Sequence, residues 1–137
     1  MDGEFPLRVR RVKGPLMSVV EQYARAHIVS DAAVPLVDEL EAVPVTLRYD
    51  PDHDPRSVRM GLPGTGGHEW IFSRDLLEEG LRAPTGSGEV RVWPCGRVQV
   101  VVEFHSAQGV SVVQFERQAL LRFLRRTYMA AAEPVTH

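Results

Sequence analysis

The hydrophobic pattern of this chain changes its period along the sequence, and this change is the strongest constraint on the fold. Four stretches that alternate apolar and polar residues come first, followed by a segment with helical spacing. Three more alternating stretches and a second helical segment follow. Strands that come in runs favour an α+β fold with mostly antiparallel sheets over a parallel βαβ fold. The predicted order is therefore ββββ-α-βββ-α.

The first run contains strands joined by turns or short loops. We predict strands at 19–29, 43–50, 56–62 and 68–72. In the second of these, Val45, Leu47 and Tyr49 share one face. Residues 30–42 are acidic and contain Pro35, so we interpret them as a loop. The turns at 51–55 and 63–67 are rich in Pro, Asp and Gly. The three strands at 43–50, 56–62 and 68–72, joined by these short turns, are interpreted as a meander.

A helix is predicted after this run, because the apolar spacing lengthens to that of Leu76, Leu77 and Leu81. Ser73 or Asp75 can cap its start, and we expect it to end near residue 82. Residues 83–88, with the sequence APTGSG, are interpreted as a loop.

The second run is predicted to form strands at 89–93, 97–106 and 110–115. The middle strand shows the clearest alternation, with one face made of Val98, Val100, Val102 and Phe104. The last helix is expected at about 117–128. Its predicted apolar side consists of Leu120, Leu121, Leu124 and Tyr128.

Composition limits the class of protein. A chain of 137 residues corresponds to one domain, with a formal net charge of −2 that argues against a dedicated nucleic-acid binder. The single Cys95 excludes an internal disulfide, and no apolar run is long enough to span a membrane. Residues 1–16 carry a local excess of positive charge. We interpret 1–16 as a flexible basic leader and 17–137 as a single domain.

The sequence predicts no catalytic residues, no metal site and no cofactor. Asp50, Asp52 and Asp54 resemble the start of a calcium loop, but Pro55 and Gly61 stand where that loop needs Gly and Glu. The glycines of 61–67 precede a predicted strand rather than the helix that a phosphate-binding loop requires. Cys95 lies in a turn without the flanking residues of a catalytic thiol.

Two surface features leave alternatives open. Trp70, Phe72 and Trp93 could stack on single-stranded bases, although packing in the core or an interface is the simpler interpretation. The last helix carries several arginines that could contact a membrane or a partner, or could form an ordinary solvated face. These are Arg117, Arg122, Arg125 and Arg126. Several strands lack a clean apolar face, which suggests that another subunit covers some of them.

Three segments carry a resemblance to a known family. They are PVTLRYD at 44–50, EWIFSRDLLEEGL at 69–81 and PTGSGEVRVWP at 84–94. Together they resemble the SsgA-like sporulation and cell-division proteins of actinomycetes, nearest to the SsgB branch. The resemblance covers about residues 17–128.

The resemblance implies a non-enzymatic regulator or adaptor of sporulation-specific cell division. It implies a cytoplasmic protein at the septum that selects septum sites and recruits the tubulin-like division GTPase FtsZ. Another SsgA-like protein is the second implied partner. The implied fold is similar to that of the plant whirly proteins, with strands of several subunits forming a barrel in a homotrimer. A single-stranded nucleic-acid-binding protein of this fold is the alternative.

The resemblance also implies a partner-binding surface. The residues that match the family motif are Trp70, Phe72, Arg74, Leu77, Gly80, Leu81, Pro84, Gly86 and Gly88. The other interpretation is that Leu77 and Leu81 belong to the core and that the glycines only permit the loop. Trp70, Arg74 and the 83–88 segment are then the exposed part.

Overall fold

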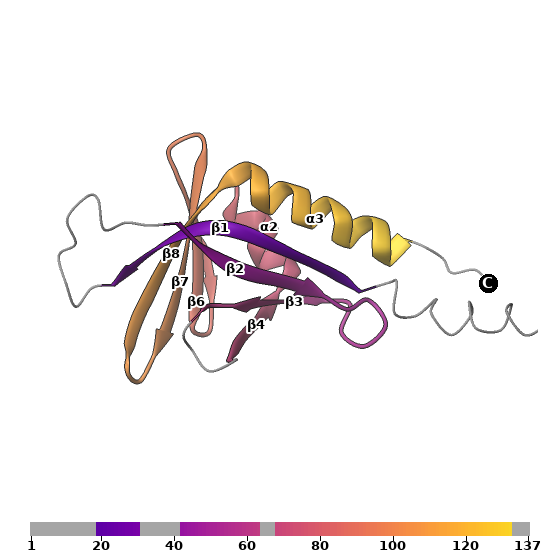
Figure 1. Ribbon diagram of the computed structural model, residues 1–137, viewed down its shortest axis with the longest axis horizontal. Helices are drawn as coiled ribbons and strands as arrows, with labels where there is room; N and C mark the ends of the chain where they lie inside the picture. Colours follow the sequence, from indigo (N-terminus) through magenta and orange to yellow (C-terminus); the bar gives the residue numbers. More distant parts are fainter. Residues whose placement is uncertain (1–18, 31–41, 64–67, 133–137) are drawn as a thin grey trace, which may run out of the picture.

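The computed structural model describes residues 19–30, 42–63 and 68–132. This part of the chain forms eight strands and two helices, drawn in Figure 1. The elements are β1 (Val20–Ser30), β2 (Ala42–Tyr49), β3 (Ser57–Gly61), β4 (Glu69–Ser73), α2 (Arg74–Gly80), β5 (Thr85–Ser87), β6 (Val90–Cys95), β7 (Gln99–Ser106), β8 (Gly109–Glu116) and α3 (Arg117–Ala132). The predicted leader 1–16, residues 31–41 of the predicted loop and residues 64–67 of the predicted glycine turn lie outside the described residues.

All eight strands form one antiparallel sheet with the order β4-β3-β2-β1-β8-β7-β6-β5. Each half of the chain forms a meander, and the pairing of β1 with β8 joins the two. In that pairing Ala26 lies opposite Phe115 and Ser30 opposite Ser111. The prediction of an α+β fold with antiparallel strands is confirmed.

The predicted order lacked one strand. Residues 83–88, predicted as a loop, contain β5, which pairs with β6. The two strands are joined by Gly88 and Glu89 between the paired residues Ser87 and Val90. Gly88 has φ of 63°, which the first residue of a type II′ hairpin turn requires. The correct order is ββββ-α-ββββ-α. A strand of three residues is too short to show an alternating pattern. The glycines of 83–88 therefore led to the prediction of a loop.

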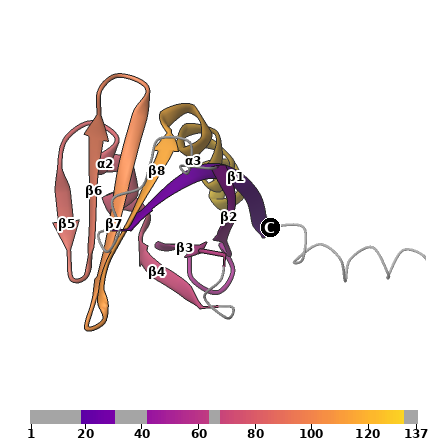
Figure 2. The ribbon, with the colours of Figure 1, turned by 60° about the vertical axis from the view of Figure 1, so that its left-hand side comes forward.

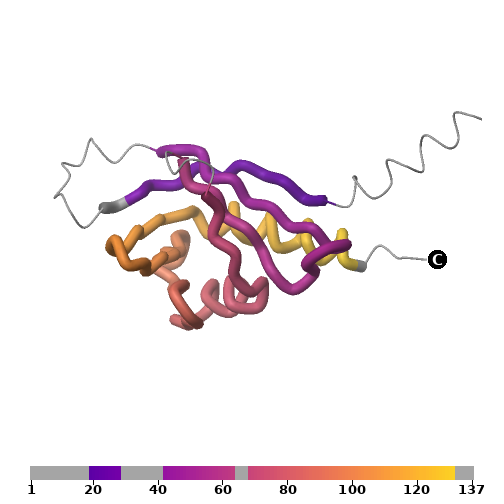
Figure 3. Tube along the Cα trace, turned by 90° about the horizontal axis from the view of Figure 1, so that it is seen from below, coloured from indigo at the N-terminus to yellow at the C-terminus, as the bar shows by residue number. Residues whose placement is uncertain are grey.

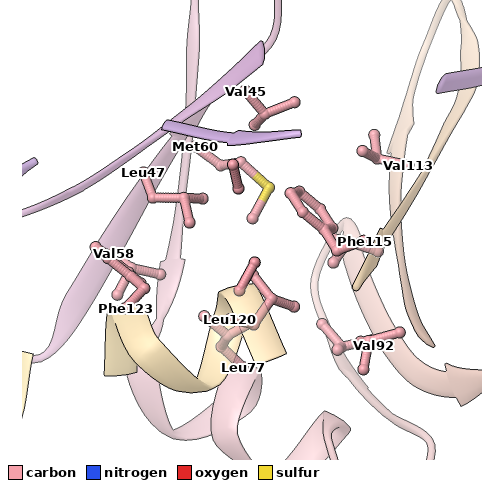
Figure 4. Packing of buried hydrophobic residues seen from close by; sticks show 14 of the residues in the cluster. Val45, Leu47, Val58, Met60, Leu77, Val92, Val113, Phe115, Leu120 and Phe123 are labelled. Atoms are coloured by element: carbon pink, nitrogen blue, oxygen red, sulfur yellow. The ribbon is translucent and has the colours of Figure 1, made fainter. Parts of the chain in front are cut away.

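The sheet curls until its two halves face each other across the core. The ring of Trp70 on β4 stacks on Phe104 of β7 with centroids 4.7 Å apart, and Phe72 meets the same ring edge-on at 6.0 Å. Figure 2 shows β3 and β4 turned out of the plane of β5–β8. In Figure 4 the fully buried side chains of both meanders and both helices converge on one interior. The core is therefore single and continuous.

The strand faces follow the predicted alternation except at Val98 and at Val101, which is buried on the other face of β7. Val45, Leu47 and Tyr49 are buried on β2, as predicted. On β7, Val100, Val102 and Phe104 are completely buried. Val98 is 69% exposed, so its predicted place on that face is wrong. It lies in the turn before β7, where the two-residue alternation has not begun.

The helices fill the hollow of the curled sheet. Ser73 caps α2, since its hydroxyl accepts a hydrogen bond from the amide of Leu76. The helix α3 runs alongside β1, as Figure 3 also shows, and is longer than predicted. Its buried face includes Phe123 as well as Leu120 and Leu124. Tyr128, predicted on the apolar side of the helix, is 39% exposed and lies at the flank of this face.

Neither helix in the described ranges is long and apolar enough to cross a membrane.

Gly80 allows α2 to contact β6 directly. A Cβ atom built on Gly80 would lie 2.2 Å from Cγ1 of Val92 and 3.1 Å from the backbone carbon of the same residue. Val92 is completely buried and held between β5 and β7. Neither the helix nor the strand has room to yield, so this position needs glycine.

The substitution Gly80→Ala is therefore expected to destabilise the protein. Overpacking of a core contact costs about 1–3 kcal/mol. The matched control is Gly61→Ala, where the added Cβ would meet its nearest neighbours at 3.6 and 3.7 Å, an ordinary contact distance. Urea unfolding of both variants measures the difference. Equal midpoints for the two variants would contradict the close-packing argument.

Candidate partner-binding surface

The residues predicted to bind a partner all lie on the segment from β4 through α2 to β5, but on different sides of it. Phe72, Leu77, Gly80 and Leu81 are buried in the core of the chain. Their side of the segment faces β6 and β7 and is not available to a partner in this structure. The interpretation that Leu77 and Leu81 are core residues is thus the one the structure supports.

Trp70 lies at the open end of the core. Its indole is half-buried against Phe104, and His68 meets it edge-on with ring centroids 5.3 Å apart. It lines a surface depression of about 560 Å³ together with Ile71, Glu89 and residues of the β7–β8 hairpin. Trp70 therefore has a structural contact on one side and an accessible edge on the other.

Arg74 connects three elements. Its guanidinium lies between two aromatic rings, 5.2 Å from the centroid of Tyr49 on β2 and 4.0 Å from that of Tyr128 on α3. Its Nη1 donates a hydrogen bond of 3.2 Å to the Tyr49 hydroxyl, which donates in turn to the carbonyl of Pro55 at 2.9 Å. The Arg74 side chain therefore makes most of its contacts within the chain.

The tyrosine hydroxyls on both sides of Arg74 are held in hydrogen bonds. Tyr128 donates to the carboxylate of Glu78 on α2. This hydrogen bond, together with burial, raises the pKa of Tyr128 above its usual value of 10.0. Burial also raises the pKa of Tyr49, an effect that the positive charge of Arg74 partly offsets. Both phenols consequently stay neutral at physiological pH.

Pro84, Gly86 and Gly88 form the exposed part of the predicted site. They belong to the β5 edge of the sheet, where a shallow depression of about 480 Å³ opens over the outer face of β6 and β7. Its other walls are the side chains of Arg91, Trp93 and Glu103. We call Pro84–Gly88 with these three residues the β5 surface.

A hydrogen-bonded network fixes the polar side of the β5 surface. The indole Nε1 of Trp93 donates to one carboxylate oxygen of Glu103 at 2.8 Å, and Nε2 of His105 lies 3.0 Å from the other. Partial burial alone would raise the pKa of Glu103, but the hydrogen bonds from His105 and Trp93 outweigh it and lower the pKa below 4.5. The carboxylate is therefore ionised and the Trp93 ring is held in place.

The residues of this network were not among the predicted site residues. Arg91 and Trp93 alternate with the buried Val90 and Val92 on β6, and Glu103 alternates with core residues of β7 in the same way. The period-two pattern that identified the core also identifies the residues opposite it. The signal was therefore present in the sequence.

The aspartate-rich turn has a structural role. The Asp50 carboxylate accepts hydrogen bonds from the backbone amides of Asp52 and His53, and its second oxygen lies 2.8 Å from Nδ1 of His53. Partial burial would raise the pKa of Asp50, yet these hydrogen bonds lower it. The predicted turn is confirmed. Over the ranges that the structure covers, no three His, Cys, Asp or Glu side chains come together as a metal site.

Replacing Arg74 tests whether its role is structural. Arg74→Ala removes a hydrogen bond and two aromatic contacts, so we expect a loss of about 1–3 kcal/mol in the free energy of unfolding. Arg56→Ala, at an exposed arginine on the β2–β3 turn, should change it by about 0.5 kcal/mol or less. Thermal and urea unfolding give the comparison. If Arg74→Ala left stability unchanged, its side chain would have no structural role.

The Glu103 network predicts a pH dependence of stability. Because the folded-state pKa of Glu103 is lowered, its stabilising effect is complete above the unfolded value near 4.5 and is lost as pH falls through the lowered folded value. The gap in unfolding free energy between the parent and Glu103→Gln should therefore be constant above that pH and shrink below it. Glu79→Gln, at an exposed site on α2, serves as the control. If this difference in unfolding free energy did not change with pH, the lowered pKa of Glu103 would be contradicted.

Comparison with known proteins places this geometry in a family. The model of the family described as "Streptomyces sporulation and cell division protein, SsgA" matches residues 43–134. The sporulation-specific cell division protein SsgB of Streptomyces coelicolor is 37% identical over 123 residues, which cover 85% of this chain and 83% of the relative. SsgB of Saccharopolyspora erythraea is 42% identical over 101 residues, 68% of this chain and 70% of the relative.

Solved structures agree with these matches. A structure from work that correlates SsgB mutations with longitudinal cell division in Streptomyces coelicolor has a TM-score of 0.66 at 36% identity, covering 82% of this chain and 86% of that one. An SsgA-like sporulation-specific cell division protein of Thermobifida fusca has a TM-score of 0.65 at 28% identity, covering 84% of each chain. The chain therefore belongs to the SsgA family of sporulation and cell division proteins.

Proposed function

We propose that this protein is a non-catalytic adaptor of sporulation-specific cell division, which acts at the septum through protein contacts. The observation that carries the proposal is the 37% identity with SsgB over 85% of the chain, together with a matching fold. The protein would be cytoplasmic and would help to select the sites at which septa form.

The proposed partners are the tubulin-like GTPase FtsZ and another SsgA-like protein. Both follow from the resemblance to SsgB. The β5 surface suits such a contact because Trp93 is half-buried and Arg91 is exposed beside it. Aromatic and arginine side chains that are held in place before binding are enriched in the energetic centres of protein interfaces. Recruitment of FtsZ through this surface is our specific hypothesis.

Self-association is the second part of the proposal. The sheet has two edges, β4 and β5, and Ile71 on β4 is 52% exposed. Sheet edges present unpaired backbone groups that other strands can pair with. We propose a homotrimer in which strands of several subunits complete a barrel.

Single-stranded nucleic-acid binding is the alternative for a whirly-like fold. It requires aromatic rings free to stack on bases. Two of the three aromatic candidates are otherwise engaged, since Trp70 stacks on Phe104 and Phe72 is buried. The indole of Trp93 donates its proton to Glu103. We therefore favour protein contacts.

Cosedimentation with FtsZ polymers tests the adaptor role. The parent protein should pellet with FtsZ in the presence of GTP, and Arg91→Glu should bind about tenfold or more weakly. Arg56→Glu makes the same charge change at an exposed arginine outside the β5 surface and should bind like the parent. If the parent did not bind FtsZ, the adaptor proposal would fail. If both variants weakened FtsZ binding equally, the β5 surface would not be the binding site.

Light scattering coupled to size-exclusion chromatography tests the oligomer independently. The expected mass is about three times the 15.3 kDa of one chain. A monomer at micromolar concentration would contradict the shared barrel while leaving the FtsZ assay to decide the adaptor role.

A further inference from the structure

A second surface lies where β1 and β8 separate. The two strands pair only as far as Ala26 and Phe115, because α3 begins at Arg117 directly after β8. The remaining part of β1, Val20–Arg25, pairs with β2 on one side and with no strand of the described chain on the other. Figure 1 shows β1 continuing past β8 beside α3.

A depression of about 420 Å³ occupies this fork. Its lining includes the small or apolar residues Ala24, Phe115 and Ala119, which are all buried. Polar side chains from β1, β7, β8 and α3 surround them. These are Tyr23, Arg25, His27, Gln99, Gln114, Glu116 and Arg122. We call this depression the β1–α3 notch.

Positive charge predominates around the β1–α3 notch, although the whole chain has a net charge of −2. Arg25 and Arg122 line it, and Arg125 lies one turn further along α3. All three are exposed, and none of their side chains makes a hydrogen bond or ion pair with another described residue. Arg126 binds the carbonyl of Glu21 and the side chain of Gln22. The carboxylate in the lining of the notch is that of Glu116.

The β1–α3 notch also contains an unsatisfied polar atom. Nδ1 of His27 is buried and has no hydrogen-bond partner among the described residues. The side chains of Gln99 and Gln114, which bond to each other, lie in the same lining. Buried polar atoms normally have a partner, so the ring of His27, which lines the depression, has one unfilled hydrogen-bonding position.

We propose that the β1–α3 notch binds an extended acidic peptide of a partner protein. Alternate side chains of an extended peptide point in opposite directions. One set of apolar side chains would fill the space over Ala24, Phe115 and Ala119, and carboxylates would reach Arg25 and Arg122. Arg126 and Ala119 of α3 bond to Glu21 and Gln22. The part of the β1 edge that lines the notch and along which such a peptide can lie is therefore Tyr23–Arg25. This site is separate from the β5 surface and does not depend on the proposed function.

Other anionic partners fit this geometry less well. An amphipathic helix that lies in a membrane needs a free apolar face. The apolar face of α3, with Leu120, Phe123 and Leu124, is buried in the core instead. A nucleic acid would bring phosphates close to Glu116 and has no use for a strand edge. A strand edge, buried apolar residues and arginines together suit a polypeptide better than a membrane or a nucleic acid.

Fluorescence anisotropy with a labelled synthetic peptide, in which glutamate and valine alternate, tests the proposal. Saturable binding that weakens with added salt is expected. The double variant Arg25→Glu/Arg122→Glu should lose about tenfold or more in affinity. Arg56→Glu/Arg82→Glu makes the same charge change at two exposed arginines outside the notch and should bind like the parent. Thermal unfolding of each variant verifies that the fold is intact.

Three further probes separate the peptide from other ligands. A peptide with glutamine in place of glutamate should not bind, and one with its glutamates in a single block should bind more weakly than the alternating peptide. Amide NMR signals of Arg25 and Gln114 should shift on titration. No binding, equal loss in both double variants, or stronger notch-dependent binding to phosphatidylglycerol vesicles or oligothymidylate would overturn the proposal. Each of these results leaves the FtsZ assay unaffected.

Discussion

The contact of β4 with β7 across the core determines the shape of the whole molecule. These strands are separated by four others in the sheet order, yet Trp70 and Phe72 both meet the ring of Phe104. A sheet can bring such distant strands together only by strong twist and curl. The curl gives the longer strands, such as β2 and β7, an enclosed face and an outward face. It also leaves a hollow between the two meanders, which α2 and α3 fill.

The division into two faces explains where function can reside. Residues of the family motif such as Leu77 and Gly80 point into the hollow and are needed for packing against β6. Arg74 holds α2 between β2 and α3. A motif can thus be characteristic of a family because it builds the fold. The residues that we propose for binding lie on the outward face, where Trp93 and Glu103 are positioned by each other.

Much of this architecture could be predicted from local periodicity. The strands of the first meander, the cap at Ser73 and the buried faces of β2 and β7 follow from patterns of a few residues. β5 could not be predicted, since a strand of three residues is stabilised by its pairing with β6. The position of Arg74 could not be predicted either, because Tyr49 and Tyr128, which its guanidinium contacts, lie far away in the sequence. Long-range contacts of this kind leave no local signal.

One feature of the β1–α3 notch has a consequence for regulation. Its cationic side chains are arginines, and Lys13, the one lysine of the chain, lies outside the described residues. Guanidinium groups keep their charge at every physiological pH, and lysine acetyltransferases do not act on them. Acetylation of lysine therefore cannot alter the positive charge that Arg25 and Arg122 bring to this surface. A cell that needs to release a bound acidic segment has to change the ionic strength or the charge of the segment itself.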